Sequence, residues 1–335
     1  MLIEKQPLTQ IELDEIHRLK DFIPDKVFDS HSHIYDSAFT PTVHPEEKFG
    51  KSVLDVNQYK ENMLPLLGNP SLLRANYIIF PDKSMSCKDS EYLEKADKFL
   101  IEQLENDPLS VGEIIVRPCD SAEDIEKRLI HKNIRGLKCY HYLAHKDVTW
   151  NLDVEEYLPD SAWEVANKHH LAITLHLVKE NSASDLNNLN YILRMAKRYP
   201  NVNLILAHCA RSFASWTIFE PIKEFCKYDN IWFDFSSICD PVPMMAIMKA
   251  LNVERCMWGT DSPISNIRGK ATSFADSFHW FYESDFIGKD MNKPKQFFTI
   301  GVENLIATKQ ACDLLNLSTK KIEDLFYNNA NLLWK

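Results

Sequence analysis

Glycine is scarce in this sequence. Only 8 of its 335 residues are glycine, and none belongs to a G-x-G-x-x-G or P-loop pattern, so nucleotide phosphates have no glycine-rich loop to hold them. No apolar run is long enough to cross a bilayer. The first residues also lack the basic segment and apolar core of a signal peptide. These absences argue against a membrane partner and a nucleotide cofactor.

Basic residues are outnumbered by acidic ones. The chain has 38 Lys and Arg against 48 Asp and Glu, a formal net charge of -10 with neutral histidines, and it has no long basic run. This balance argues against binding to nucleic acid or to an anionic membrane surface. A small molecule is therefore the expected partner.

Cysteine pairs at metal-site or redox spacing are absent. None of the eight cysteines forms a C-x-x-C motif, and several lie in apolar, strand-like runs. Without a targeting segment, we expect reduced, mostly buried thiols and a cytoplasmic location. The even number of cysteines keeps disulfides as the alternative.

The chain contains ample material for a large core. Hydrophobic residues make up 45% of it and aromatic residues 11%, which is typical of a globular protein. Length alone allows one large domain or two smaller ones. We expect residues 1–335 to form a single domain, with residues 1–25 as an N-terminal helical extension.

Short apolar runs alternate with amphipathic stretches along most of the chain. The runs are nearly continuous in apolar residues, as expected for strands buried on both faces. The expected strands are 26–31, 75–80, 112–118, 134–140, 171–177, 202–208, 230–236 and 255–261. The expected helices are 90–107, 121–132, 158–170, 187–199 and 241–251, with Ser90 and Ser121 as N-caps. Eight strands with intervening helices predict a (β/α)8 TIM barrel.

Two connections are too long for simple turns. Residues 35–74 follow the first strand, and roughly 262–300 follow the last. Both leave the carboxyl ends of strands, where barrel enzymes carry their chemistry. We therefore expect long insertions after the first and last strands, which cover or shape an active site.

Two histidines stand one residue apart at the end of the first strand. Side chains at positions i and i+2 of a strand point to the same side, so His31 and His33 could both ligate one cation. This spacing is a weak signal by itself, because two surface imidazoles would give the same pattern. Asp29 precedes them on the same face and is a candidate to orient one of the rings.

Three further polar residues end later strands. His176 and His208 lie at or near the ends of the fifth and sixth expected strands, and Asp261 lies at the end of the eighth. Each could be structural: the histidines could be buried core residues, and the aspartate could cap a turn. A closed barrel would bring all five strand-end residues together, and this coincidence favours a functional site.

Three imidazoles and a carboxylate suit one divalent cation. Zinc is expected first, with manganese or another divalent cation as alternatives, because zinc accepts nitrogen and oxygen ligands and leaves a position for water. Asp261 could bind the cation and accept the proton of the water. His208 would orient the water or polarise the substrate.

These motifs resemble the amidohydrolase superfamily, in its amidohydrolase-related or decarboxylase-like branch. The resemblance rests on HSH at 31–33, His176, AHC at 207–209, GTDSP at 259–263, GLK at 136–138 and the NNANLLW ending. It implies that His31, His33, His176 and Asp261 ligate one metal, with Asp261 and His208 as the catalytic residues. It also makes a homodimer the default expectation.

Three more residues are candidates for substrate binding. Relatives often have glycines after the sixth-strand histidine, whereas this chain has Arg211 nearby, which could hold a carboxylate or lie on the surface. In binuclear relatives a fourth-strand lysine is carbamylated and bridges two metals. For this chain we favour a single metal, with Lys138 binding substrate or pairing with a carboxylate. Tyr140 could line the same mouth or belong to the core. In the last long connection, Arg268, His279 and Trp280 are further candidates.

The expected activity is that of a metal-dependent hydrolase. The substrate would be a small carboxylate-bearing, amide or lactone molecule attacked by metal-activated water. One alternative is a non-oxidative decarboxylase or hydratase of an unsaturated or aromatic acid. A non-catalytic, ligand-binding barrel is an alternative of another class.

Overall fold

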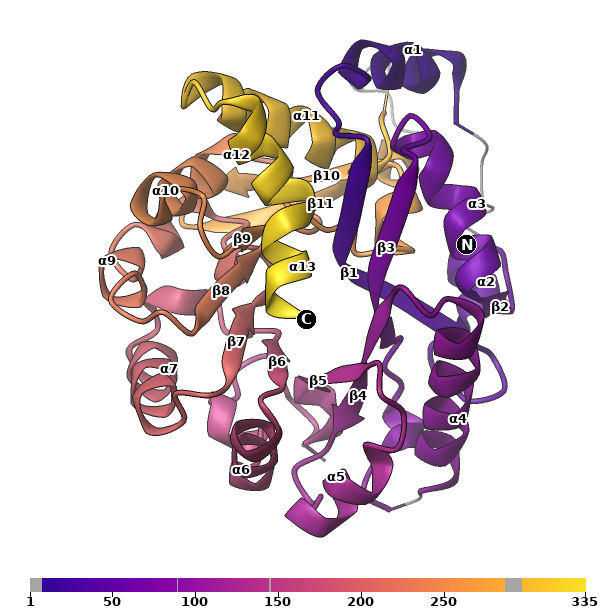
Figure 1. Ribbon diagram of the computed structural model, residues 1–335, viewed down its shortest axis with the longest axis vertical. Helices are drawn as coiled ribbons and strands as arrows, with labels where there is room; N and C mark the ends of the chain where they lie inside the picture. The colour runs from indigo at the N-terminus through magenta and orange to yellow at the C-terminus, as the bar shows by residue number, and fades with distance from the viewer. Residues whose placement is uncertain (1–7, 89, 145, 287–296) are drawn as a thin grey trace.

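A curled, mostly parallel sheet forms the centre of the molecule, and helices surround it (Figure 1). The computed structural model describes residues 8–88, 90–144, 146–286 and 297–335. The nine strands lie in the order β2-β1-β3-β4-β5-β6-β7-β8-β9. They are β1 (Lys26–Asp36), β2 (Val53–Leu54), β3 (Leu72–Ile79), β4 (Val111–Val116), β5 (Ile134–Cys139), β6 (Ala172–Leu175), β7 (Asn203–Leu206), β8 (Ile231–Asp234) and β9 (Cys256–Met257).

All eight predicted strands are present as parallel strands of this sheet. Each predicted range overlaps β1 or one of β3 to β9, and neighbours along the chain pair in parallel. Strand β2 was not predicted, because it has only two residues and pairs antiparallel with the end of β1. The architecture is consistent with the expected (β/α)8 barrel.

Backbone hydrogen bonds also join the two edges of the parallel sheet. The N–H of Ser30 donates to the carbonyl of Trp258 at 3.0 Å, and the N–H of His33 donates to the carbonyl of Ser262 at 2.7 Å. In the opposite direction, the N–H of Asp261 donates to the carbonyl of His31 at 2.7 Å. The first strand and the segment after β9 are therefore neighbours, and they bring three predicted site residues together.

The predicted helices are confirmed as α4, α5, α6, α7 and α10. The larger helices are α1 (Gln10–Leu19), α3 (Val56–Leu66), α4 (Glu91–Asn106), α5 (Ala122–Arg128), α6 (Asp160–His169), α7 (Leu186–Arg198), α10 (Pro241–Leu251) and α11 (Ile300–Leu314). Ser121 caps α5 as predicted, and Asp124 returns the bond to the Ser121 N–H as in a capping box. Ser90 occupies the N-cap of α4 without a side-chain capping bond.

The last helix closes the amino-terminal end of the sheet. Helix α13 (Asn329–Leu333) lies across the middle of the view in Figure 1. Ala330 and Trp334 join a buried hydrophobic cluster with one residue from each of six strands, namely Phe28, Val111, Ala172, Ile205, Trp232 and Met257. The carboxyl ends of the strands are left for the chemistry.

Both long connections contain secondary structure. The first contains α2 (Pro45–Phe49), β2 and α3, and the last contains the hairpin of β10 (Gly269–Phe274) and β11 (Ser277–Tyr282). Residues 287–296 of the last connection lie outside the described residues. Helix α1 contacts this region, because Nη2 of Arg268 lies 2.7 Å from Oε2 of Glu12, and both side chains are buried.

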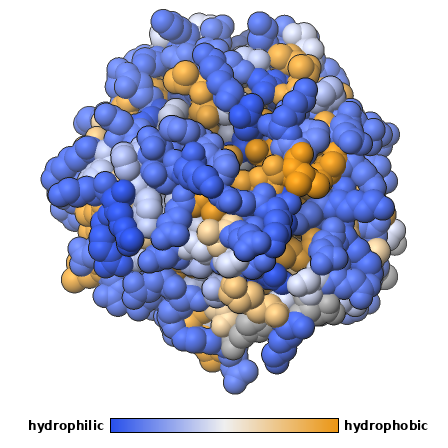
Figure 2. Space-filling model, turned by 60° about the horizontal axis from the view of Figure 1, so that its bottom comes forward, coloured by the Kyte–Doolittle hydropathy of each residue, from blue (hydrophilic) through white to orange (hydrophobic). Residues whose placement is uncertain are grey.

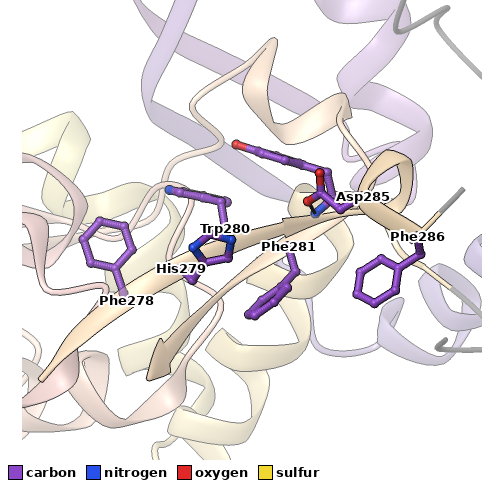
Figure 3. A pocket seen from close by; sticks show the side chains of 7 residues that line it. Phe278, His279, Trp280, Phe281, Asp285 and Phe286 are labelled. Atoms are coloured by element: carbon purple, nitrogen blue, oxygen red, sulfur yellow. Dashed lines mark hydrogen bonds between the residues drawn. The ribbon is translucent and has the colours of Figure 1, made fainter. Parts of the chain in front are cut away.

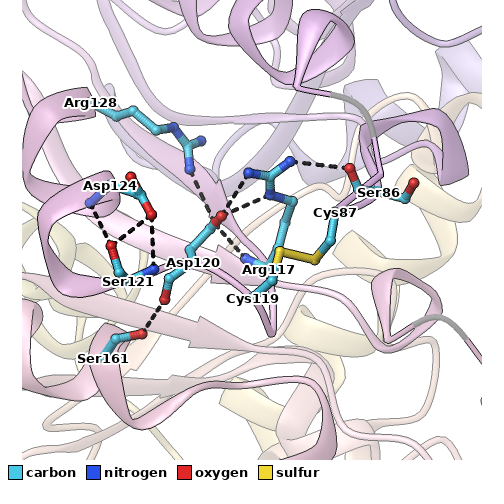
Figure 4. Close-up of a disulfide and its surroundings, with 9 residues drawn as sticks. All are labelled: Ser86, Cys87, Arg117, Cys119, Asp120, Ser121, Asp124, Arg128 and Ser161. Atoms are coloured by element: carbon cyan, nitrogen blue, oxygen red, sulfur yellow. Dashed lines mark hydrogen bonds and ion pairs between the residues drawn. A yellow bond between two sulfur atoms is a disulfide. The ribbon is translucent and has the colours of Figure 1, made fainter.

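One expectation about the cysteines is wrong. Cys87 and Cys119 form a disulfide, although they are 32 residues apart. The two cysteines lie in the loops that follow the neighbouring strands β3 and β4. The fold therefore brings them together, although their spacing in the sequence matches no motif. Arg117 ties the same loops by donating to the carbonyl of Ser86 at 3.1 Å (Figure 4). The other six cysteines are free, and five of them are buried.

The face shown in Figure 2 is mainly hydrophilic, with hydrophobic side chains gathered in separate places. The large hydrophobic side chains that are exposed are spread over the chain from Ile11 to Leu332. None of the helices among the described residues combines the length and the apolar character needed to cross a membrane.

Candidate metal centre

The strand ends bring the predicted ligands together. His31 and His33 lie within β1, His176 directly follows β6, and His208 lies two residues beyond the end of β7. Asp261 follows β9 and is bonded to β1 through its backbone. Five side chains from four strands therefore meet at one end of the sheet.

Side-chain distances define a compact cluster. One ligand atom from each of His31, His208 and Asp261 lies within 4.8 Å of the others. Oδ1 of Asp261 lies 3.2 Å from Nε2 of His33 and 3.8 Å from Nε2 of His31. All four side chains are buried. This is the spacing of groups that could share one cation.

His176 stands at the edge of the cluster. Its ring centre is 5.3 Å from that of His208, and the two rings are nearly perpendicular. Nδ1 of His176 and Nδ1 of His33 are buried without a hydrogen-bond partner in the described structure. Unsatisfied buried nitrogens are rare in proteins, so both rings keep capacity for a group that the protein does not supply.

Hydrogen bonds fix two of the rings. Nδ1 of His31 lies 3.0 Å from Oδ2 of Asp234, and Nδ1 of His208 lies 3.0 Å from the carbonyl oxygen of Ser236. These acceptors assign the proton to Nδ1 in both rings and leave the Nε2 lone pairs available as ligands. Sequence reasoning missed Asp234. It is the last residue of β8, and the other site residues were predicted because they are polar residues at the ends of strands.

Asp29 holds the backbone of the site instead of a ring. Its carboxylate accepts the N–H of His31 at 3.1 Å and the N–H of Thr260 at 2.8 Å. It also accepts the Tyr59 hydroxyl at 2.7 Å and the Thr260 hydroxyl. Asp29 therefore ties β1 to the segment that carries Asp261, in place of the ring contact expected from the sequence.

Electrostatics favour neutral histidines and ionised aspartates. Burial, followed by the charge of Lys138, lowers the pKa of His31 to about 3, and burial also lowers the pKa of His33 and of His176. Burial alone would raise the pKa of Asp261, but the charge of His208 and the hydrogen bond with His33 lower it. Metal ligands must be deprotonated, and these groups are deprotonated at neutral pH.

Lys138 lies within the cluster and is fully buried. Its Nζ is 3.4 Å from Nε2 of His31 and 5.0 Å from the ring centre of Tyr140. The hydroxyl of Tyr140 is in turn 3.4 Å from Nε2 of His33. Lys138 and Tyr140, two of the three residues first predicted to bind substrate, therefore contact the predicted metal ligands.

Arg211 lies beside the cluster with its guanidinium between two aromatic rings. The group is 5.1 Å from the ring of Phe278 and 5.7 Å from that of Trp150. Its Nη1 donates to the carbonyl of Lys179 at 2.8 Å and to Oγ of Ser182 at 3.2 Å. In the described part of the chain no carboxylate forms an ion pair with Arg211, and burial lowers the pKa of its guanidinium.

A left-handed turn links His208 to Arg211. All four residues from His208 to Arg211 have φ between 54° and 58°, and the N–H of Ser212 donates to the carbonyl of His208 at 3.0 Å. Left-handed backbone costs about 1–2 kcal/mol for each residue with a Cβ. None of these four residues is glycine, so the turn is strained. Backbone strain of this kind is typical of functional sites.

Aromatic rings extend from the cluster to the hairpin. Phe213 packs 5.7 Å from the His208 ring, and Phe278 and Trp280 of β11 pack on Phe213 at 4.9 and 5.2 Å. Figure 3 shows the pocket of about 680 Å³ formed by the hairpin and the residues after it. None of the candidate metal ligands lines this pocket, so the pocket is separate from the histidine and aspartate cluster. Of the three candidates in this connection, Trp280 reaches the wall of the site, whereas Arg268 pairs with Glu12.

Comparison with known proteins decides the family. A family model described as Amidohydrolase matches residues 29–335. The chain belongs to the amidohydrolase family. A search of curated proteins found no significant match.

Solved structures share the fold of this amidohydrolase at low sequence identity. A zinc-bound amidohydrolase from Burkholderia multivorans has 12% identity and a TM-score of 0.57, covering 92% of this chain and 99% of that one. A 2-pyrone-4,6-dicarboxylic acid hydrolase candidate from Pseudomonas putida has 12% identity and a TM-score of 0.54, covering 92% and 97%. A 2,6-dihydroxybenzoate decarboxylase complexed with 2,6-dihydroxybenzoate has 12% identity and a TM-score of 0.56, covering 92% and 99%.

The side chains of this amidohydrolase fit a divalent cation. Imidazole nitrogens and a carboxylate oxygen are the donors that zinc and similar metals accept. Asp234 and Ser236 orient two of these rings, and the Nδ1 atoms of His33 and His176 have no hydrogen-bond partner in the described structure. By the spacing of their ligand atoms, His31, His208 and Asp261 would hold the metal, and His33 and His176 border them.

Proposed function

We propose that this amidohydrolase is a (β/α)8-barrel, metal-dependent hydrolase of a small molecule, and that residues 1–335 form a single domain with an N-terminal helical extension. The substrate class is a carboxylate-bearing, amide or lactone compound. The approach of His31, His208 and Asp261 to within 4.8 Å of one another carries the proposal.

A divalent cation supplies Lewis acidity in such a site and lowers the pKa of water to about 7. We take zinc as the first candidate, with His31, His33, His176 and Asp261 as ligands. The low pKa values of the histidines keep their lone pairs free for this purpose.

Asp261 is the proposed proton acceptor. Its Oδ2 accepts the Ser237 hydroxyl at 2.8 Å, and its Oδ1 faces His33. This pair of contacts orients the carboxylate toward the cluster. A proton taken from the attacking water at Oδ1 would stay inside the site, close to the leaving group that needs it. His208, held through Nδ1 by Ser236, presents Nε2 to the same space and would position the substrate carbonyl or the water.

Arg211 and Tyr140 are the proposed substrate contacts. Arg211 has no carboxylate partner among the described residues and keeps donors beyond the two bonds of its Nη1. A guanidinium can bind a carboxylate through two parallel hydrogen bonds. The rings of Trp150 and Phe278 lie 5.7 and 5.1 Å from the Arg211 guanidinium, and the Tyr140 hydroxyl faces the cluster near His33.

Decarboxylation of an aromatic acid is the second candidate. The observation in its favour is the aromatic wall beside the cluster, where Phe213, Phe278 and Trp280 would accept a planar ring. The similarity in fold to a dihydroxybenzoate decarboxylase supports the same reading.

The deciding experiment is a panel of lactones, amides and aromatic acids, with acid release and CO2 release measured in parallel. We expect hydrolysis that His31→Ala and His176→Ala abolish. Arg211→Met should raise KM for carboxylate substrates by about 10-fold or more, in line with the loss of a charged hydrogen bond. The exposed Arg198→Met variant serves as the control. CO2 release without hydrolysis would replace the first candidate by the second, and binding without turnover would favour a ligand-binding barrel.

A further inference from the structure

Lys138 is a charged group that the proposed hydrolysis does not use. Its side chain is one of the largest that are fully buried, and lysine is almost never buried unless it is paired. Its Nζ lies within hydrogen-bond distance of Nε2 of His31, at 3.4 Å. Its amine therefore contacts a proposed metal ligand directly.

The acceptor of Lys138 is the atom that a metal would bind. Nδ1 of His31 is already committed to Asp234 at 3.0 Å, and Nε2 is the remaining ring nitrogen. An imidazole nitrogen has one lone pair. It cannot accept a hydrogen bond from the amine and bind a cation at the same time.

The surroundings of Lys138 carry an excess of negative charge. Burial lowers the pKa of the Lys138 amine, whereas the charges of Glu113, Asp234 and Asp261 act in the opposite direction and favour its ammonium form. In the described part of the chain no lysine or arginine, Lys138 included, forms a direct ion pair with these three carboxylates, and Lys138 is the cation whose charge acts on them from nearby. Uncompensated buried charges are strongly destabilising, so without a metal the ammonium of Lys138 is the cation that offsets them.

We propose that Lys138 stands in for the metal: its ammonium stabilises the metal-free site and competes with a divalent cation for Nε2 of His31. The inference rests on the metal site of the proposed function. It has two consequences of opposite sign. Removal of the charge weakens the metal-free protein, and it tightens metal binding.

Lys138→Met tests both consequences, because methionine keeps much of the length and removes the charge. In chelator-treated protein, we expect its Tm to fall by about 5 °C relative to the wild type. Zinc titration against a chromophoric chelator should show binding at least about 10-fold tighter than in the wild type. The thermal shift on adding zinc should therefore be larger in the variant.

Lys60→Met is the matched control. Nζ of Lys60 lies 2.9 Å from Oδ1 of Asp107, away from the cluster. This variant should respond to zinc as the wild type does. Should metal-free Lys138→Met fail to fold, recovery of folding on refolding with zinc would support the inference, and failure of both Lys138→Met and Lys138→Gln to fold with zinc would contradict it.

The outcomes separate this inference from the proposed function. Zinc binding by Lys138→Met that is equal to or weaker than that of the wild type would overturn the stand-in role while leaving the metal site intact. Failure of the wild type and of both Lys138 variants to bind zinc, manganese or cobalt would contradict the metal site itself, and the inference with it.

Discussion

Nδ1 of His31 donates a hydrogen bond to Oδ2 of Asp234 over 3.0 Å, and both side chains are fully buried. The same carboxylate accepts the backbone N–H of His208 through Oδ1 at 3.1 Å. Asp234 therefore orients one ring and anchors the start of the left-handed turn that carries another. A residue that contacts no proposed substrate thus sets the geometry of two histidines.

Asp234→Asn should weaken metal binding by about 10- to 100-fold, the usual effect of losing a carboxylate behind a metal-binding histidine. The amide retains the shape but removes the charge that fixes the ring and its tautomer. Competition titration with zinc measures the effect. Asp240→Asn, at the N-cap of α10, is the control, and an unchanged affinity in Asp234→Asn would contradict the role assigned to Asp234.

Glu113 should give the protein a specific pH dependence. Burial raises the pKa of Glu113 from its ordinary 4.5 to about 7. A folded-state pKa above the unfolded value means that its stability contribution is present below pH 4.5 and is lost as the pH rises toward 7. The Tm of the metal-free wild-type protein should therefore fall relative to that of metal-free Glu113→Gln as the pH rises from 4.5 to 7. The exposed Glu105→Gln should show no such trend, and a constant difference for Glu113→Gln would count against this account.

Two alanine-to-glycine variants test the strained turn. Ala210 in the turn and Ala311 in α11 are both fully buried, so each variant loses one buried methyl group. Glycine relieves the left-handed backbone at residue 210 but costs about 1 kcal/mol in a helix at residue 311. Ala311→Gly should therefore reduce the free energy of unfolding by about 2 kcal/mol more than Ala210→Gly. Denaturant titration measures both, and equal losses would mean that residue 210 carries no strain.

The disulfide should contribute to stability. A crosslink between positions 32 residues apart is worth about 3–4 kcal/mol in the chain-entropy description. Cys87→Ser with Cys119→Ser should lower the free energy of unfolding by an amount of this order, whereas Cys226→Ser at a free cysteine should not. Denatured protein should show six reactive thiols without a reductant and eight with one. Eight thiols without a reductant would show that the bond is absent.

The sequence was sufficient to predict most of the fold. Parallel buried strands leave continuous apolar runs, and therefore β3 to β9 could be located from hydrophobicity alone. Because the apolar runs showed where the strands end, they also showed which polar residues stand at those ends. These are His31, His33, His176, His208 and Asp261. Strand β2 was missed because two residues are too few to show a pattern of hydrophobic residues.

Other features depend on tertiary packing and have no local signal. The turn at His208 to Arg211 has positive φ angles that no local preference of histidine, cysteine, alanine or arginine would predict. Cys87 and Cys119 meet only because β3 and β4 are neighbours. The sequence also placed Asp29 correctly beside the site, but its backbone role required the position of Thr260, which comes from the other end of the chain.

The central claim is that these strand ends form a metal centre, and metal analysis of the protein purified without chelator tests it most directly. The account predicts about one equivalent of a divalent metal per chain, reduced to a trace in the His31→Ala and His176→Ala variants. Wild-type protein that holds no divalent metal, and that takes up none from zinc, manganese or cobalt solutions, would contradict the account.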